Sequence, residues 1–125
     1  MGKYVNWITY KNKRILTVDL ARQGEAEIIA GMEEMKQELF KDRSAPLVLI
    51  DITGIDMTTA VINKAKELTA VTKEAGLEDG PNVIVGLTGL QKAVAQLFAR
   101  NVHFSGSVEE AREWLVKQDD KRRKR

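Results

Sequence analysis

Two adjacent hydroxyl residues, Thr58 and Thr59, are the clearest candidates for a chemical role in this chain. They follow an almost continuous apolar run, Pro46 to Ile52, and precede a helical apolar pattern, so one of them is predicted to be a helix N-cap. A phosphoryl group on either hydroxyl would also be tolerated there, because the positive end of the helix dipole favours a dianion. The N-cap is the preferred interpretation, and phosphorylation of Thr58 or Thr59 is the alternative.

Two carboxylates, Asp51 and Asp56, flank the same loop and could be read as a general acid and base. An aspartate in the position of Asp51 more often ends a strand by accepting backbone N–H groups, and Asp56 suits a loop or a cap. The single histidine, His103, is distant in sequence and supplies no third catalytic group. The sequence therefore predicts no catalytic residues and a protein that is not an enzyme.

Metal and cofactor chemistry find little support in the composition. The chain has no cysteine and one histidine, so it lacks the ligands of the usual metal sites. His103 is predicted to be a surface or half-buried strand residue. Gly86, Thr88 and Gly89 precede a predicted helix and could present backbone N–H groups to an anion. Their spacing is neither a P-loop nor a dinucleotide-binding motif, so a turn is preferred and no cofactor is expected.

These residues must be positioned by elements that the apolar periodicity predicts. Alternating residues over Tyr4–Tyr10 and Arg14–Leu20 indicate a β-hairpin. Three further short strands are predicted over 46–52, 83–87 and 102–104, and helices over 25–42, 58–74, 90–100 and 107–118. Ser107 and Glu110 have the spacing of a capping box at the start of the last helix. This order predicts an α/β fold with a single mixed sheet of four or five strands and about four helices.

Composition and charge limit the classes of protein to which this chain could belong. The chain has 125 residues, 43% hydrophobic and 30% charged, which fits one domain, assigned to residues 1–118. The absence of cysteine and of signal-like or membrane-spanning runs predicts a cytoplasmic protein. The net charge is +2, but Lys121–Arg125 carry +5, so the remainder stands at 2 − 5 = −3. Residues 119–125 are predicted to be a disordered basic tail without specificity for nucleic acid.

An apolar group on the first long helix leaves a second interpretation open. Met32 and Met35, with Trp7 and Phe40, could line a pocket for a small apolar ligand. Such stripes more often belong to the hydrophobic core, which is the preferred interpretation.

Several motifs together resemble a known family. Strand residues that end in Asp51-Ile52-Thr53-Gly54-Ile55, followed by hydroxyl residues at a helix start, are similar to the STAS domain of anti-sigma factor antagonists and sulfate transporters. Gly86-Leu87-Thr88-Gly89 and the ending from Phe104 to Leu115, FSGSVEEAREWL, resemble the STAS-like branch related to the CRAL-TRIO lipid-binding fold. The resemblance extends from Tyr4 to Lys117.

The resemblance implies a non-enzymatic regulatory or protein-interaction module, whose partner would be a kinase or an anti-sigma-like protein. In regulatory STAS domains that kinase phosphorylates a serine in an Asp-Ser-Ser-Gly element. Here that serine position falls on Met57 or Ala60, the glycine is absent, and Thr58 or Thr59 is the nearest substitute. The interaction surface is predicted to comprise Gly54, Ile55, Asp56, Met57, Thr58, Thr59 and Ile62. The lipid-binding relatives imply the alternative, a carrier or sensor of a lipid or isoprenoid. A homodimer is compatible with both.

Overall fold

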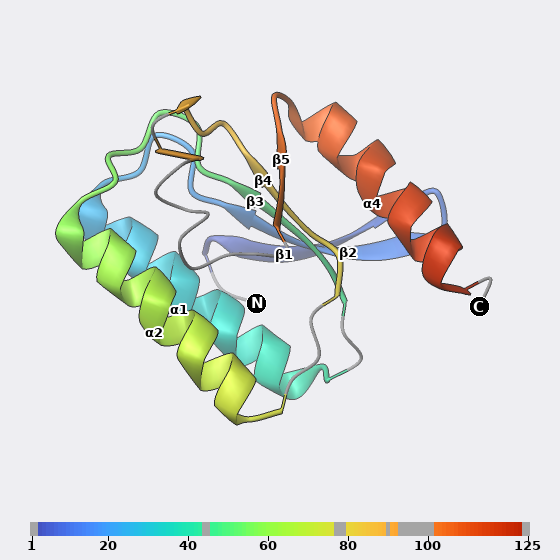
Figure 1. Ribbon diagram of the computed structural model, residues 1–125, viewed down its shortest axis with the longest axis horizontal. Helices are drawn as coiled ribbons and strands as arrows, with labels where there is room; N and C mark the ends of the chain where they lie inside the picture. Colours follow the sequence, from blue (N-terminus) through green and yellow to red (C-terminus); the bar gives the residue numbers. More distant parts are fainter. Residues whose placement is uncertain (1–2, 44–45, 77–79, 90, 93–101, 124–125) are drawn as a thin grey trace.

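The protein forms a five-stranded mixed sheet with helices on both faces (Figure 1). The computed structural model describes residues 3–43, 46–76, 80–89, 91–92 and 102–123. Along the chain the elements are β1 Val5–Tyr10, β2 Lys13–Asp19, α1 Glu25–Lys41, β3 Leu47–Asp51, α2 Thr59–Glu74, β4 Asn82–Val85, β5 Val102–Ser105 and α4 Val108–Arg123. The α/β fold with one mixed sheet is confirmed. The helix predicted over 90–100 lies largely outside the described residues, although Gly89, Gln91 and Lys92 are helical.

Strands β1 and β2 form the predicted hairpin. They pair antiparallel up to Tyr10 opposite Lys13, which leaves a two-residue loop. Lys11 and Asn12 in this loop have φ values of 49° and 66°, so both are left-handed. This is the backbone of a type I′ turn, whose twist matches that of the paired strands.

The strands lie side by side in sequence order, β1-β2-β3-β4-β5, and all pairs after the first are parallel. Parallel crossovers are right-handed, and here each one advances in the same direction across the sheet. The connecting helices α1 and α2 therefore lie on one face, and they pack against each other. Helix α4 follows the last strand and covers the opposite face (Figure 1).

The central strand β3 contributes to a core on each face. Val48 belongs to the cluster under α1 and α2, whereas Leu47 and Leu49 belong to the cluster under α4. Burial on both sides explains why this strand is an unbroken apolar run.

The two methionines of the apolar group on α1 belong to the core or pack against it. Met35 is buried in the cluster under α1 and α2, and Met32 packs against it. Trp7 donates its indole N–H to Glu38 over 2.9 Å, and Phe40 lies under the guanidinium of Arg43. The pocket that these residues could have lined gains no support from their packing.

The prediction of a disordered tail over 119–125 is wrong for residues 119–123, and residues 124–125 lie outside the described part of the chain. Helix α4 continues to Arg123. Asp119 is only 2% exposed, and its carboxylate pairs with Lys13 at 2.8 Å, Arg122 at 2.8 Å and Arg123 at 2.7 Å. Residues 119–123 are thus ordered by an ion-pair cluster with strand β2. Within the described part, no helix is both long and apolar enough to cross a bilayer.

Candidate functional site

The loop from β3 to α2 begins with a local hydrogen-bonded turn. One carboxylate oxygen of Asp51 accepts the backbone N–H of Thr53 at 3.1 Å and the hydroxyl of Thr53 at 2.7 Å. These bonds close the strand in the manner expected of aspartate at a turn. Asp51 therefore has a structural role, as its position at the end of the strand predicts.

The next residues are held by the loop that precedes α1. The carbonyl of Thr53 accepts the N–H of Arg22 at 2.8 Å. Gly54 has φ +73°, and a Cβ there would lie 3.2 Å from Cγ of Arg22. A glycine thus fits both the left-handed backbone and the close neighbour.

Ile55 anchors the middle of the loop. Its side chain is 5% exposed and packs into the core under α1 and α2. Its carbonyl accepts the side-chain amide of Gln91 at 3.2 Å. The structure therefore places Ile55 beneath the predicted interaction surface, and exposes Gly54 and Asp56 on either side of it.

Thr58 is the N-cap of α2, which confirms the prediction that one of the two adjacent threonines has this role. Its hydroxyl oxygen accepts the N–H of Val61 at 3.3 Å, and its hydroxyl hydrogen is donated to Glu25 at 2.5 Å. Glu25 is the first residue of α1, so Thr58 joins the starts of the two helices. No local pattern predicts this partner, because 33 residues separate the two side chains.

Thr59 differs from its neighbour. It is exposed and is the first residue of α2, whose first turn contains no acidic side chain. An anion on Thr59 would lie at the positive end of the helix dipole. Met57 and Ile62 are half-buried beside it, so the surface that the loop presents combines hydroxyl, acidic and apolar groups.

A lysine from α2 holds the two helices together farther along. Lys64 lies 2.7 Å from the carboxylate of Glu33 on α1. Hydrogen bonds from Lys36 and Lys64 lower the pKa of Glu33, and the bond to Glu33 raises the pKa of Lys64. Both groups are therefore charged near neutral pH, and α2 keeps a fixed position relative to α1.

The glycine turn after β4 supports the same loop from the other side. Gly86 has φ +94°, and a Cβ there would lie 2.6 Å from the backbone of Thr53. Thr88 and Gln91 form a reciprocal capping box: the Thr88 N–H donates to the Gln91 side chain at 3.1 Å, and the Gln91 N–H donates to the Thr88 hydroxyl at 3.3 Å. These two N–H groups are already bonded, which favours a turn over an anion site at Gly86, Thr88 and Gly89.

His103 lies away from this loop. It is exposed on β5 and stacks on Trp114 of α4, with ring centroids 4.3 Å apart and planes 5° apart. Ser107 caps α4 by accepting the N–H of Glu110 at 3.2 Å, and the carboxylate of Glu110 accepts the hydroxyl of Ser105 at 3.5 Å. Among the described residues, no group of three or more histidine, aspartate or glutamate side chains could hold a metal ion.

Comparisons with known proteins bear on the fold. No protein-family model matches the chain, and a search of curated proteins finds no significant match. Among solved structures, a serine-to-glutamate variant of RsbS from Moorella thermoacetica is similar, with a TM-score of 0.65 and 14% sequence identity. The match covers 93% of this chain and 97% of that one. The STAS-like fold predicted from the sequence is confirmed by this match.

Proposed function

We propose that this chain is a non-enzymatic regulatory module that binds a partner protein in the cytoplasm through the start of α2 and the loop before it. The working surface comprises Gly54, Asp56, Met57, Thr58, Thr59 and Ile62. The observation that carries the proposal is an exposed Thr59 at a helix N-terminus, beside a loop that is fixed on both sides. The fold shared with RsbS supports the same class of function.

The fixed loop favours recognition of another protein. Asp51 closes its start, Arg22 holds Thr53, and Gln91 holds Ile55. A surface ordered before binding loses less conformational entropy when a partner docks.

Thr59 is the phosphoacceptor in this proposal, and Thr58 is not. The hydroxyl of Thr58 already donates to Glu25 and accepts from Val61. A phosphoryl group there would remove the bond to Glu25 and place a dianion beside a carboxylate. On Thr59 the same group would face solvent at the start of α2. A kinase or anti-sigma-like protein is the partner proposed.

The experiment separates the effect of a negative charge at position 59 from the effect of a larger side chain there. Tagged wild-type protein, Thr59→Glu and the uncharged control Thr59→Gln are expressed in the source cells, captured, and weighed by native mass spectrometry. Wild type and Thr59→Gln should retain the same stoichiometric partner, whereas Thr59→Glu should lose at least about 90% of it, because a negative charge repels an acidic partner surface.

Far-UV circular dichroism checks that both variants keep the fold. Equal partner retention by Thr59→Glu and Thr59→Gln, or capture of wild type without any partner, would overturn the proposal. The apolar-carrier alternative has no support from the methionines that it relies on, because they pack in the core.

A further inference from the structure

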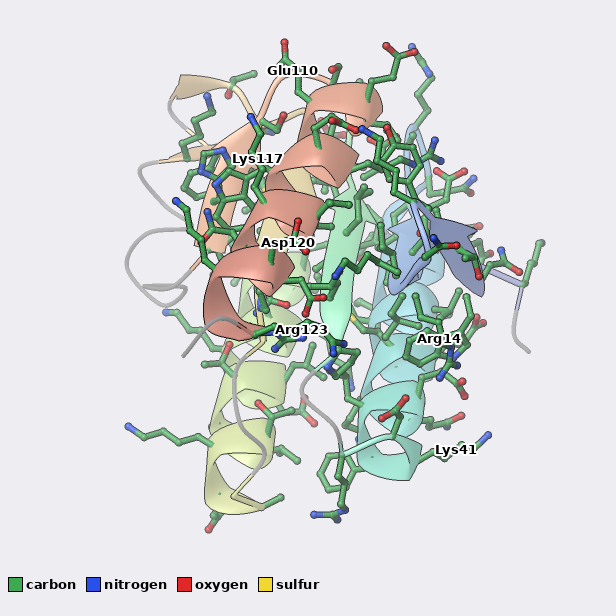
Figure 2. The ribbon with its side chains drawn as sticks, turned by 90° about the vertical axis from the view of Figure 1, so that its right-hand side faces the viewer. Arg14, Lys41, Glu110, Lys117, Asp120 and Arg123 are labelled. Carbon is green, nitrogen blue, oxygen red and sulfur yellow. The ribbon has the colours of Figure 1, made fainter. Side chains whose placement is uncertain are left out.

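A groove runs between the edge strand β5 and helix α4. It is lined on the strand by His103 and Ser105, and on the helix by Glu109, Glu110, Trp114 and Lys117, among others. Figure 2 shows Glu110 and Lys117 along α4, with Glu110 near the start of the helix. None of these residues belongs to the surface around Thr59, and the groove is built on the helix that covers the other face of the sheet.

Strand β5, which contributes to this groove, has one backbone edge that pairs with no other described strand. The carbonyl of Ser105 accepts the N–H of Gly86, so Ser105 directs its backbone groups toward β4. Successive residues of a strand alternate, hence Val102 and Phe104 direct theirs away from β4. Within the described part of the chain, β5 ends the sheet and no other strand pairs on that side. An extended peptide can add to such an edge by main-chain hydrogen bonds.

The side chains of the groove indicate which peptide would fit. The stacked rings of His103 and Trp114 give it an aromatic wall that stays accessible at His103. Glu109 and Glu110 are exposed at one end. Glu113 is already paired with Lys11 at 2.8 Å, so its charge is compensated within the chain. Lys117 adds a positive charge about two turns farther along α4, so the negative end of the groove is the one with Glu109 and Glu110. These two carboxylates complement lysine or arginine, whose alkyl stems also pack on aromatic rings.

We propose that this groove binds an extended, lysine- or arginine-rich segment of a partner protein as an added strand on β5. The backbone groups of Val102 and Phe104 hold the main chain of the peptide. Glu109 and Glu110 pair with its basic side chains, and the rings of His103 and Trp114 pack against their stems. This inference is independent of the function proposed for Thr59, because it concerns another face and other residues.

The test uses a synthetic probe of stated sequence, acetyl-Lys-Val-Lys-Val-Lys-Val-amide, titrated into the isotope-labelled full chain and followed by NMR. Chemical-shift changes should concentrate on residues 102–106 and 109–117. A matched peptide with glutamate in place of lysine should bind at least about tenfold more weakly, since its charges oppose those of the groove.

Three variants assign the contacts. The double change Glu109→Gln and Glu110→Gln should weaken binding of the lysine peptide about fivefold at low salt, because exposed ion pairs each contribute modestly. His103→Ala should weaken it about threefold through the loss of one aromatic wall. Glu74→Gln, an exposed carboxylate at the end of α2, is the matched control and should leave the affinity unchanged.

Circular dichroism confirms that each variant remains folded. Equal affinity for the lysine and glutamate peptides, shifts centred on Gly54–Ile62, or unchanged binding by the double variant would each overturn the proposal. Self-association through β5, seen by sedimentation as a dimer that excludes the peptide, would also overturn it.

Discussion

At the carboxyl edge of the sheet, the turn after β4 packs closely against the loop after β3 because Gly86 has no side chain. Gly86 allows the turn after β4 to approach Thr53, which itself is bonded to Asp51. Any Cβ at this position would enter the space of the Thr53 backbone and would also be strained by the left-handed φ. The position of the candidate surface around Thr59 therefore depends on Gly86, which is not part of that surface.

We expect Gly86→Ala to lower the free energy of unfolding by about 3 kcal/mol, the sum of backbone strain and steric overlap. Gly76→Ala is the matched control, since Gly76 has φ +72° but no atom of the described residues lies within 4 Å of the added Cβ. It should lose only about 1 kcal/mol from strain alone. Urea denaturation measures both, and equal losses would show that contact with Thr53 is unimportant.

Helix α4 is fastened at its C-terminal end by one buried carboxylate. Burial alone raises the pKa of Asp119, but hydrogen bonds from Lys13, Arg123 and Arg122 outweigh it and hold the pKa well below its usual range. Because the pKa of Asp119 is lower in the folded than in the unfolded state, the carboxylate contributes fully to the free energy of unfolding at neutral pH. That contribution declines as pH falls below the ordinary value of about 3.9.

We expect Asp119→Asn to reduce the free energy of unfolding at pH 7 by about 2 kcal/mol, because three cations lose their shared anion. The difference from wild type should shrink below about pH 3.9, because the unfolded wild-type chain then binds a proton on Asp119 that the folded protein does not. Asp120→Asn is the control, since Asp120 is 53% exposed and pairs with Lys13 at 2.9 Å without being buried in the cluster. Urea midpoints at several pH values test this, and a constant difference across the range would contradict it.

The elements were largely predictable because their signals are local. Apolar spacing predicted α1 and α2 to within a residue or so, and the two hydroxyl residues before the apolar pattern predicted an N-cap at Thr58 or Thr59. The end of α4 was missed because Asp119 is stabilised by Lys13, which lies near the other end of the chain. The partners Glu25 and Arg22 were missed for the same reason. Gln91 alone had a readable signal, the Thr-x-x-Gln spacing from Thr88.

At the scale of the whole molecule, one sheet separates two apolar clusters. Trp7 packs against the cluster under α1 and α2, and Trp114 packs against the cluster under α4. Strand β3 contributes side chains to both clusters, so neither can be lost without disturbing the other. The two layers should therefore unfold together.

Each tryptophan reports on one layer when the other is replaced by phenylalanine. In Trp7→Phe and in Trp114→Phe we expect the fluorescence transition in urea to coincide with the far-UV circular dichroism transition of the same variant. The two variants need not share a midpoint, because Trp7 also loses its bond to Glu38. A fluorescence midpoint that departs from the dichroism midpoint within one variant would show that the layers unfold separately.

The strands β1 to β5 are synthesised in the order in which they lie side by side, so each new strand can pair with the strand synthesised before it. Helices α1 and α2 are synthesised between strands and can cover one face of the growing sheet as it forms. The other face of the sheet is covered only when α4 is synthesised, after all five strands. Until then Ile15, Leu49 and Val83 remain open to water on the nascent chain, and this late-covered face is where a chaperone that binds apolar segments would act.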